Sequence, residues 1–100
     1  MSYRIEITAE AEHEILNAKS WYEEQQTGLG QSFTETIKEY VNNLKDPAIE
    51  HKIVFKNVRR VLTRRFPFVI YYTRDEKKFV VKILAVLHNR QQQLKFEERT

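Results

Sequence analysis

Residues 66–88 read FPFVIYYTRDEKKFVVKILAVLH, and this stretch decides the fold. Its two ends, residues 66–73 and 79–88, are dense in aromatic and β-branched side chains, which suit the pleated surface of a sheet. The polar residues 74–78 between them are typical of a turn. The stretch therefore predicts two long neighbouring strands, with Pro67 at the start of the first, where a missing backbone donor costs least.

Residues outside this stretch show two further periodic patterns. From Ile53 onward the pattern has a period of two, first Ile53 and Phe55 and then Val58, Arg60 and Leu62, which predicts two shorter strands with Asn57 in the turn between them. Residues 3–8 alternate in the same way and predict a half-buried first strand. Between these segments the apolar side chains fall at helical spacing, first at Ala11, Ile15, Leu16, Ala18, Trp21 and Tyr22, and then at Phe33, Ile37, Tyr40, Val41 and Leu44.

Capping residues indicate where the two predicted helices begin and end. Thr8 is a suitable N-cap for the first helix, and Gly28 suits a left-handed cap at its C-terminal end. The second helix is expected to begin at about Gly30 and to stop at Asp46-Pro47. Because the link between the helices is short, they form an antiparallel hairpin, and Trp21 and Tyr22, near the end of the first helix, are expected in the core.

The order of these elements predicts the fold class. A strand, a helical hairpin and then three or four strands is the order of an α+β fold. We expect the hairpin to pack on one face of a mainly antiparallel four- to five-stranded sheet, whose other face is uncovered or only partly covered. A chain of 100 residues has the usual size of one domain, so residues 1–100 are assigned to a single domain.

The composition excludes several classes of protein and site. There is no cysteine, so a disulfide framework and a thiolate nucleophile are excluded. The N-terminus lacks the apolar segment of a signal peptide, and no apolar run approaches the roughly 20 residues that span a bilayer, so we expect a cytoplasmic protein. His13 and His51 have no partners at metal-ligand spacing, and no Gly-rich phosphate loop is present, so we expect no metal and no cofactor.

The charges are divided unequally between the two halves of the chain. Residues 1–50 carry four Lys/Arg against ten Asp/Glu, and residues 51–100 carry thirteen against four. Such a separation predicts an acidic face and a basic face, and a basic face attracts phosphates or acidic partners. The alternative is that the charges of each half only keep their own surface in contact with water.

A basic cluster surrounds residues 61–63. Arg59, Arg60, Arg64 and Arg65 flank this segment, and Arg90, Lys95 and Arg99 add to the same half. If the strand continues through the cluster, Arg60 and Arg64 share one face and Arg59 and Arg65 share the other. Guanidinium groups bind phosphates and carboxylates through two parallel hydrogen bonds, which suits a binding surface. The alternative is an edge strand whose charges prevent aggregation.

Two other features could take part in chemistry or binding. His88 ends the longest predicted strand and could act as a general acid or base near neutral pH, or be a strand-end histidine bonded to the backbone. Tyr71 and Tyr72 are neighbours in a strand and cannot face the same side. One of the two rings could stack on a nucleic-acid base, although core packing is the simpler interpretation.

Seven segments occur in a fixed order along the chain. They are the alternating first strand, residues 20–23 (SWYE), residues 28–33 (GLGQSF), Asp46-Pro47, residues 58–60 (VRR), residues 65–72 (RFPFVIYY) and residues 83–90 (ILAVLHNR). Together they resemble the RelE/ParE toxin superfamily of type II toxin–antitoxin systems, and the likeness covers nearly the whole chain. The resemblance implies the same helical hairpin on an antiparallel sheet. It also implies a cognate antitoxin whose C-terminal segment wraps the toxin.

The resemblance implies one of two activities. ParE-like toxins inhibit DNA gyrase by binding, whereas RelE-like toxins are metal-independent endoribonucleases that cleave mRNA on the ribosome. For a nuclease, the implied catalytic residues are Arg59, Arg65 and His88. The residues expected to contact the target or nucleic acid are Arg60, Arg64, Arg90, Lys95 and Arg99.

Two positions depart from the nuclease pattern. Phe68 stands where several of the nucleases have an arginine, and Asn89 stands where they often have a tyrosine. We therefore expect a growth-inhibiting toxin that acts on gyrase in the ParE manner. A RelE-like endoribonuclease acting on the ribosome is the alternative, so enzymatic activity is left open.

Overall fold

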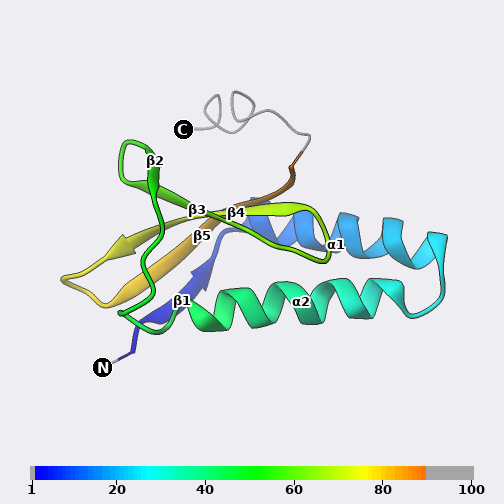
Figure 1. Cartoon of the computed structure of the whole chain (residues 1–100), viewed down its shortest axis with the longest axis horizontal. Coiled ribbons are helices and arrows are strands. Elements are labelled where there is room, and N and C mark those ends of the chain that lie inside the picture. Colours follow the sequence, from blue (N-terminus) through cyan, green and yellow to red (C-terminus); the bar gives the residue numbers. More distant parts are fainter. Residues whose placement is uncertain (1, 90–100) are drawn as a thin grey trace.

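A five-stranded sheet carries two helices on one face (Figure 1). The computed structural model of the chain describes residues 2–89. The strands lie in the order β1-β5-β4-β3-β2, which confirms the expected α+β fold. Among the described helices, neither is long and apolar enough to cross a membrane. The elements in chain order are β1 (Arg4–Ile7), α1 (Ala9–Gln25), α2 (Leu29–Asn43), β2 (Ile53–Phe55), β3 (Val58–Leu62), β4 (Phe68–Asp75) and β5 (Val80–His88).

The two longest strands form the centre of the sheet. β4 and β5 pair antiparallel, with Phe68 opposite His88 at one end and Asp75 opposite Val80 at the other. The predicted central hairpin is confirmed, although β4 begins and ends two residues later than expected. β3 continues the antiparallel pairing and β2 follows it, whereas β1 runs parallel to β5.

Two caps define the helical hairpin. Thr8 caps α1 as predicted, because its Oγ1 accepts a hydrogen bond of 3.1 Å from the N–H of Ala11. Gly28 has a φ of 88°, which is the predicted left-handed conformation. Gly28 is, however, the N-cap of α2, and the residue that caps the end of α1 is Gln26. α2 also ends at Asn43, before the expected stop at Asp46-Pro47.

The two helices are in close contact at Gly30. The carboxylate of Glu23, on α1, accepts hydrogen bonds of 3.0 Å from the N–H groups of both Gly28 and Gly30. A negative charge at this point also complements the positive end of the α2 dipole. A Cβ atom on Gly30 would lie 2.6 Å from the backbone oxygen of Lys19, so the contact leaves no room for a side chain.

Apolar side chains are buried on both faces of the sheet. The main cluster lies between the helices and the sheet and includes Phe33, Ile37, Ile70 and Tyr72. A second cluster lies on the opposite face and consists of Val58, Val69, Tyr71, Ala85 and Leu87. The sequence predicts that this second face is uncovered or only partly covered, but the residues at its centre are buried. The two tyrosines are therefore both core residues, one on each side of β4.

Two predicted core positions of α1 are exposed. Trp21 is 56% exposed and Leu16 is 54% exposed. Tyr22, in contrast, packs against the rings of Phe33 and Phe66, with centroids 5.2 and 4.9 Å away. The expectation that Trp21 lies in the core is wrong, because consecutive helix positions point about 100° apart and only Tyr22 faces the sheet.

A β-bulge changes the alternation of β5. Tyr71 pairs with Ala85 but Tyr72 pairs with Ile83, so Leu84 is the additional residue. Two side chains from α1 and its N-cap satisfy the backbone around it. The Glu14 carboxylate accepts from the N–H of Val86 at 2.9 Å, and the Thr8 hydroxyl donates to the carbonyl of Leu84 at 3.2 Å. An extra residue reverses the direction of the following side chains. This reversal decides which side of the sheet His88 faces.

Candidate functional site

The strand β3 ends before the arginine cluster does. β3 stops at Leu62, and the buried Thr63 then turns the chain. Its hydroxyl donates to the carbonyl of Phe66 and accepts from the N–H of Phe68 at 3.2 Å. Arg64 and Arg65 consequently lie in the loop between β3 and β4. The predicted strand register, in which Arg60 shares a face with Arg64 and Arg59 with Arg65, is therefore wrong.

Arg59 faces the helix side of the sheet and is held by neighbouring groups. Its guanidinium donates a hydrogen bond of 2.6 Å to the backbone carbonyl of His51 and forms an ion pair of 3.4 Å with Glu50. The Arg59 side chain is only 14% exposed. These contacts hold the segment before β2 against β3. Arg59, a predicted catalytic residue, therefore has a structural role here.

The three other arginines of the cluster are exposed. Arg60 lies on the face of β3 opposite to Arg59, next to Lys52, whose carbonyl accepts from the Arg60 N–H at 3.4 Å. In the loop, the backbone N–H of Arg64 donates to the hydroxyl of Tyr40 at 3.2 Å, and the Arg65 guanidinium lies 5.1 Å from the Phe66 ring centre. Arg60, Arg64 and Arg65 form no ion pair with any other residue of the 2–89 region.

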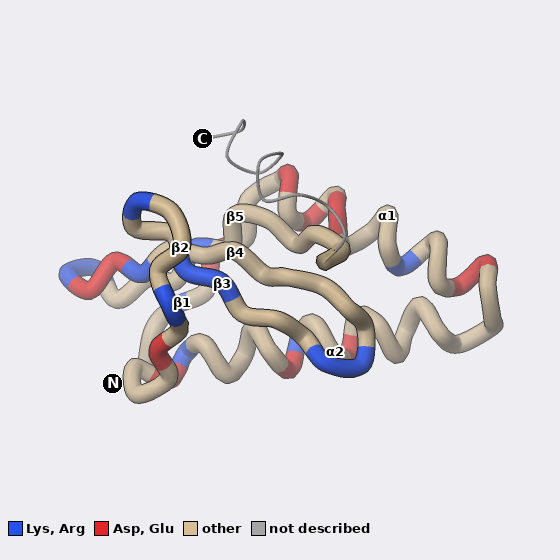
Figure 2. Tube along the Cα trace, turned by 45° about the horizontal axis from the view of Figure 1, so that its top comes forward, with Lys and Arg blue, Asp and Glu red and all other residues tan. Residues whose placement is uncertain are grey.

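The basic residues of the second half occupy several separate places on the chain. Figure 2 marks them along β3, in the β3–β4 loop, in the β2–β3 turn and in the β4–β5 turn. The last group contains Lys77 and Lys78, at the far end of β4 from Arg64. Three residues of the predicted binding surface, Arg90, Lys95 and Arg99, lie outside the described residues.

His88 lies on the helix side of the sheet, at the end of β5. Its ring contacts the ring of Phe68 edge to face, with centroids 5.4 Å apart. Together with three residues of α1 these two rings line a pocket of about 430 Å³, whose other residues are Ala18, Trp21 and Tyr22. His88 is thus placed among aromatic side chains, at the same end of the sheet as the β3–β4 loop.

The sheet register separates His88 from Arg59. His88 pairs with Phe68, and Arg59 pairs with Tyr72, four residues further along β4. At a rise of about 3.3 Å per residue, the two backbone positions are roughly 13 Å apart along the strand. Arg65 lies in the loop that leads into Phe68, and its guanidinium lies over the Phe66 ring. The structure therefore does not bring the three predicted catalytic residues together.

A partly buried hydrogen bond joins β4 to the segment before β2. Nδ1 of His51 lies 2.7 Å from the hydroxyl of the fully buried Tyr72. Burial lowers the pKa of His51, and the adjacent positive charge of Arg59 lowers it further. Burial also raises the pKa of the Tyr72 hydroxyl, so this group remains protonated at neutral pH. His51 and Tyr72 therefore form an uncharged hydrogen-bonded pair next to the guanidinium of Arg59.

This contact predicts an acid-sensitive stability. A histidine whose pKa is lowered by folding binds protons more readily when the chain is unfolded, so acid favours unfolding. The free energy of unfolding should therefore begin to fall as the pH drops through 6.5, the ordinary pKa of histidine. Urea unfolding at pH 7.5 and at pH 5.5 measures this loss, and the variant His51→Gln should lose less. An equal loss in both proteins would contradict the role of His51.

Arg74 is not among the predicted functional residues, yet its side chain donates more of the hydrogen bonds described here than any other Lys or Arg of residues 2–89. Its guanidinium donates to the carbonyls of Ile49 and Pro47, at 3.1 and 3.3 Å, and to the Tyr3 hydroxyl at 3.0 Å. The side chain is 8% exposed and lies over the Tyr3 ring. Burial opposes the charge, but the bond to Tyr3 and the nearby carboxylates outweigh it and raise the Arg74 pKa. Nothing in the sequence separates this arginine from the exposed ones.

Similar solved structures support the fold. A chain of the chromosomal ParDE toxin–antitoxin system from P. aeruginosa matches with a TM-score of 0.75 and 17% identity, over 86% of this chain and 95% of that one. The isolated E. coli RelE toxin matches with a TM-score of 0.59 and 16% identity, over 97% of this chain and 95% of that one. At such low identity these likenesses show the fold, which is that of the RelE/ParE toxins. Among curated proteins no sequence matches this chain.

The family is shown by a sequence model. Residues 5–93 match the model described as the ParE toxin of the type II toxin–antitoxin system parDE. The match covers most of the chain, and the chain therefore belongs to the ParE toxin family. It is the toxin component of a type II toxin–antitoxin system, and a cognate antitoxin is its implied partner.

Proposed function

We propose that this toxin inhibits DNA gyrase by binding and does not cleave nucleic acid. The observation that carries the proposal is the separation of His88 from Arg59. Metal-independent cleavage needs a proton-transfer group and a cation within hydrogen-bond reach of the same phosphate. Here Arg59 is bound to His51 and Glu50, and His88 packs on Phe68 four register positions away.

The exposed arginines are the proposed contacts with the target. Arg60 and Arg64 lie at the surface without a carboxylate partner among residues 2–89, so their guanidinium groups are available to acidic side chains or phosphates. Arg90, Lys95 and Arg99 are proposed to extend this contact. Because the basic positions are separated, the contact with the target would be spread over β3 and the β3–β4 loop.

Two parallel assays test the proposal. Purified toxin is added to a gyrase supercoiling reaction and, separately, to ribosomes that carry mRNA. We expect inhibition in the first and no cleavage in the second, and His88→Ala should inhibit gyrase as well as the parent toxin. Cleavage of ribosome-bound mRNA that is lost in His88→Ala would instead establish the RelE-like endoribonuclease activity.

A charge-reversal pair tests the proposed contacts. The double variant Arg60→Glu/Arg64→Glu should need about tenfold more protein for half-maximal gyrase inhibition, because charged contacts speed association and strengthen binding. The control is Lys77→Glu/Lys78→Glu, which makes the same change of charge in the β4–β5 turn. If both double variants lose the same activity, net charge matters and the arginines have no specific role.

A further inference from the structure

The strand β3 ends in an exposed apolar side chain. Leu62 is 57% exposed, which is the highest value among the large apolar residues of region 2–89. It pairs with Val69 of β4, and Val69 pairs with Leu87 of β5, so the three side chains form one row on the face of the sheet away from the helices. The two inner members of this row are buried in the second cluster. Leu62 thus extends that cluster to the surface, on a strand that the sheet holds in place.

Basic side chains surround Leu62. Arg60 lies two positions before it on the same face of β3, and Arg64 lies two positions after it, in the β3–β4 loop (Figure 2). Neither guanidinium forms an ion pair with another residue of the 2–89 region. Residues 51–73 contain six Lys/Arg and no Asp/Glu, so this part of the chain supplies no carboxylate that could compensate them. An apolar centre with a polar rim is the composition of a protein–protein interface.

The chemistry of this surface fits a protein segment better than a nucleic-acid backbone. Phosphates would satisfy the cations, but they would leave the apolar side chain of Leu62 without a contact. An acidic protein segment that also carries an apolar side chain satisfies both features. A second copy of this chain fits less well, because two such surfaces would bring the guanidinium groups of Arg60 and Arg64 together.

We infer that Leu62 is the apolar centre of the surface that binds gyrase, and that gyrase presents to it an acidic segment with an apolar side chain. The inference rests on the proposed inhibition of gyrase by binding. The apolar side chain of the segment covers Leu62, and its carboxylates bind the guanidinium groups of Arg60 and Arg64. The target contact therefore contains an apolar anchor in addition to the exposed arginines.

A change that removes the apolar contact and leaves the net charge as it is tests the inference. Purified Leu62→Ser toxin should need about tenfold more protein than the parent toxin for half-maximal inhibition of gyrase supercoiling, because truncation of a central interface side chain weakens binding. Leu62→Met restores an apolar side chain and should inhibit like the parent toxin. The exposed position of Leu62 makes unfolding unlikely to explain a loss, and circular dichroism of each variant checks this.

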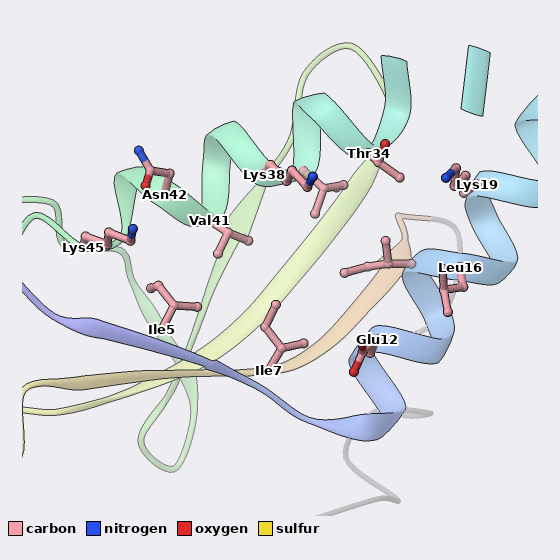
Figure 3. A pocket seen from close by; sticks show the side chains of 12 residues that line it. Ile5, Ile7, Glu12, Leu16, Lys19, Thr34, Lys38, Val41, Asn42 and Lys45 are labelled. Carbon is pink, nitrogen blue, oxygen red and sulfur yellow. The ribbon is translucent and has the colours of Figure 1, made fainter. Parts of the chain in front are cut away.

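The matched control is the same substitution at another exposed leucine. Leu16 is 54% exposed on α1, and it lines a groove between β1, α1 and α2 (Figure 3). Figure 3 shows it near Ile5 and Ile7 of β1, the edge strand at the opposite end of the sheet order from β2 and β3. Leu16→Ser should therefore inhibit gyrase like the parent toxin. If Leu62→Ser and Leu16→Ser have equal effects, the inference is wrong.

Salt and DNA distinguish the proposed contact from a purely charged one. Salt screens charges but not an apolar contact, so the loss in Leu62→Ser should persist at high salt, whereas the loss in Arg60→Glu/Arg64→Glu should shrink. The parent toxin should also bind gyrase in the absence of DNA. If it binds a DNA duplex without gyrase, and Leu62→Ser weakens that binding, the surface contacts DNA and the inference is wrong.

The parent toxin separates this inference from the proposed function. If the parent toxin does not inhibit gyrase, the proposed function fails and the inference fails with it. If the parent toxin inhibits gyrase and Leu62→Ser inhibits equally well, only the inference is wrong. If the parent toxin alone is a dimer that Leu62→Ser dissociates, a second copy covers Leu62, and the inference is again wrong.

Discussion

Replacing Arg74 with methionine is expected to lower the free energy of unfolding by about 3 kcal/mol. The substitution keeps most of the apolar stem but removes the donors to the carbonyls of Pro47 and Ile49 and to the Tyr3 hydroxyl. Hydrogen bonds from a charged group contribute more than neutral ones, and the acceptors would be left in a largely buried site. Urea unfolding monitored by circular dichroism measures the change.

Two further substitutions distinguish the hydrogen-bonded Arg74 from an ordinary surface charge. Arg74→Lys keeps the charge but cannot reach three acceptors with one planar group, so it should recover only part of the loss. The control is Arg4→Met, since Arg4 forms an exposed ion pair with Glu6 and should change stability by less than about 1 kcal/mol. If Arg74→Met and Arg4→Met lower the free energy of unfolding equally, the hydrogen bonds of Arg74 do not stabilise the fold as proposed.

Replacing Gly30 with alanine is expected to destabilise the protein by about 2 kcal/mol or more. The new methyl group would meet the backbone oxygen of Lys19 at 2.6 Å, and a backbone atom of α1 can yield only if the helices move apart. Alanine favours a helix by about 1 kcal/mol over glycine, so the cost of separating the helices exceeds the net loss by about that amount. Thermal unfolding of the purified variant gives this quantity.

Replacing Gly28 should also destabilise the protein, but through backbone conformation and not through a steric clash. A Cβ atom on Gly28 would meet nothing within 4 Å, but its φ of 88° is unfavourable for a side chain. Gly28→Ala should therefore cost about 1–2 kcal/mol, and Gly28→Asn should cost less because asparagine tolerates the left-handed region. If Gly30→Ala proves the milder of the two alanine variants, the close contact between the helices does not limit stability.

The sequence predicts the elements whose pattern is strong. The dense apolar runs of β4 and β5 and the helical spacing in α1 and α2 each leave one plausible secondary structure, and their order leaves one fold class. Gly28 is also predictable, because few other residues adopt a positive φ. The exposure of Trp21 was missed because both Trp21 and Tyr22 suit an apolar stripe, and only the packing of Tyr22 on Phe33 and Phe66 decides between them.

The candidate site is less predictable because it depends on two local irregularities. Thr63 has a good strand propensity, yet its buried hydroxyl closes a turn and moves Arg64 and Arg65 out of β3. The bulge at Leu84 reverses the alternation of β5 and brings His88 to the helix side with Val81 and Ile83. Neither the turn at Thr63 nor the bulge at Leu84 changes the hydrophobic pattern of the sequence. The sequence therefore predicts which residues form the basic cluster, but not the directions in which their side chains point.

The parallel pairing of β1 with β5 has a consequence for synthesis. Residues 4–7 are synthesised well before residues 80–83, which form their only partner strand among the described residues. Until that late segment emerges, the N-terminal strand cannot join the sheet, and long-range closure of this kind is slow. A nascent chain interrupted before residue 80 thus lacks β5, the strand that joins β1 to β4, so the sheet can be completed only after residues 80–88 have been made.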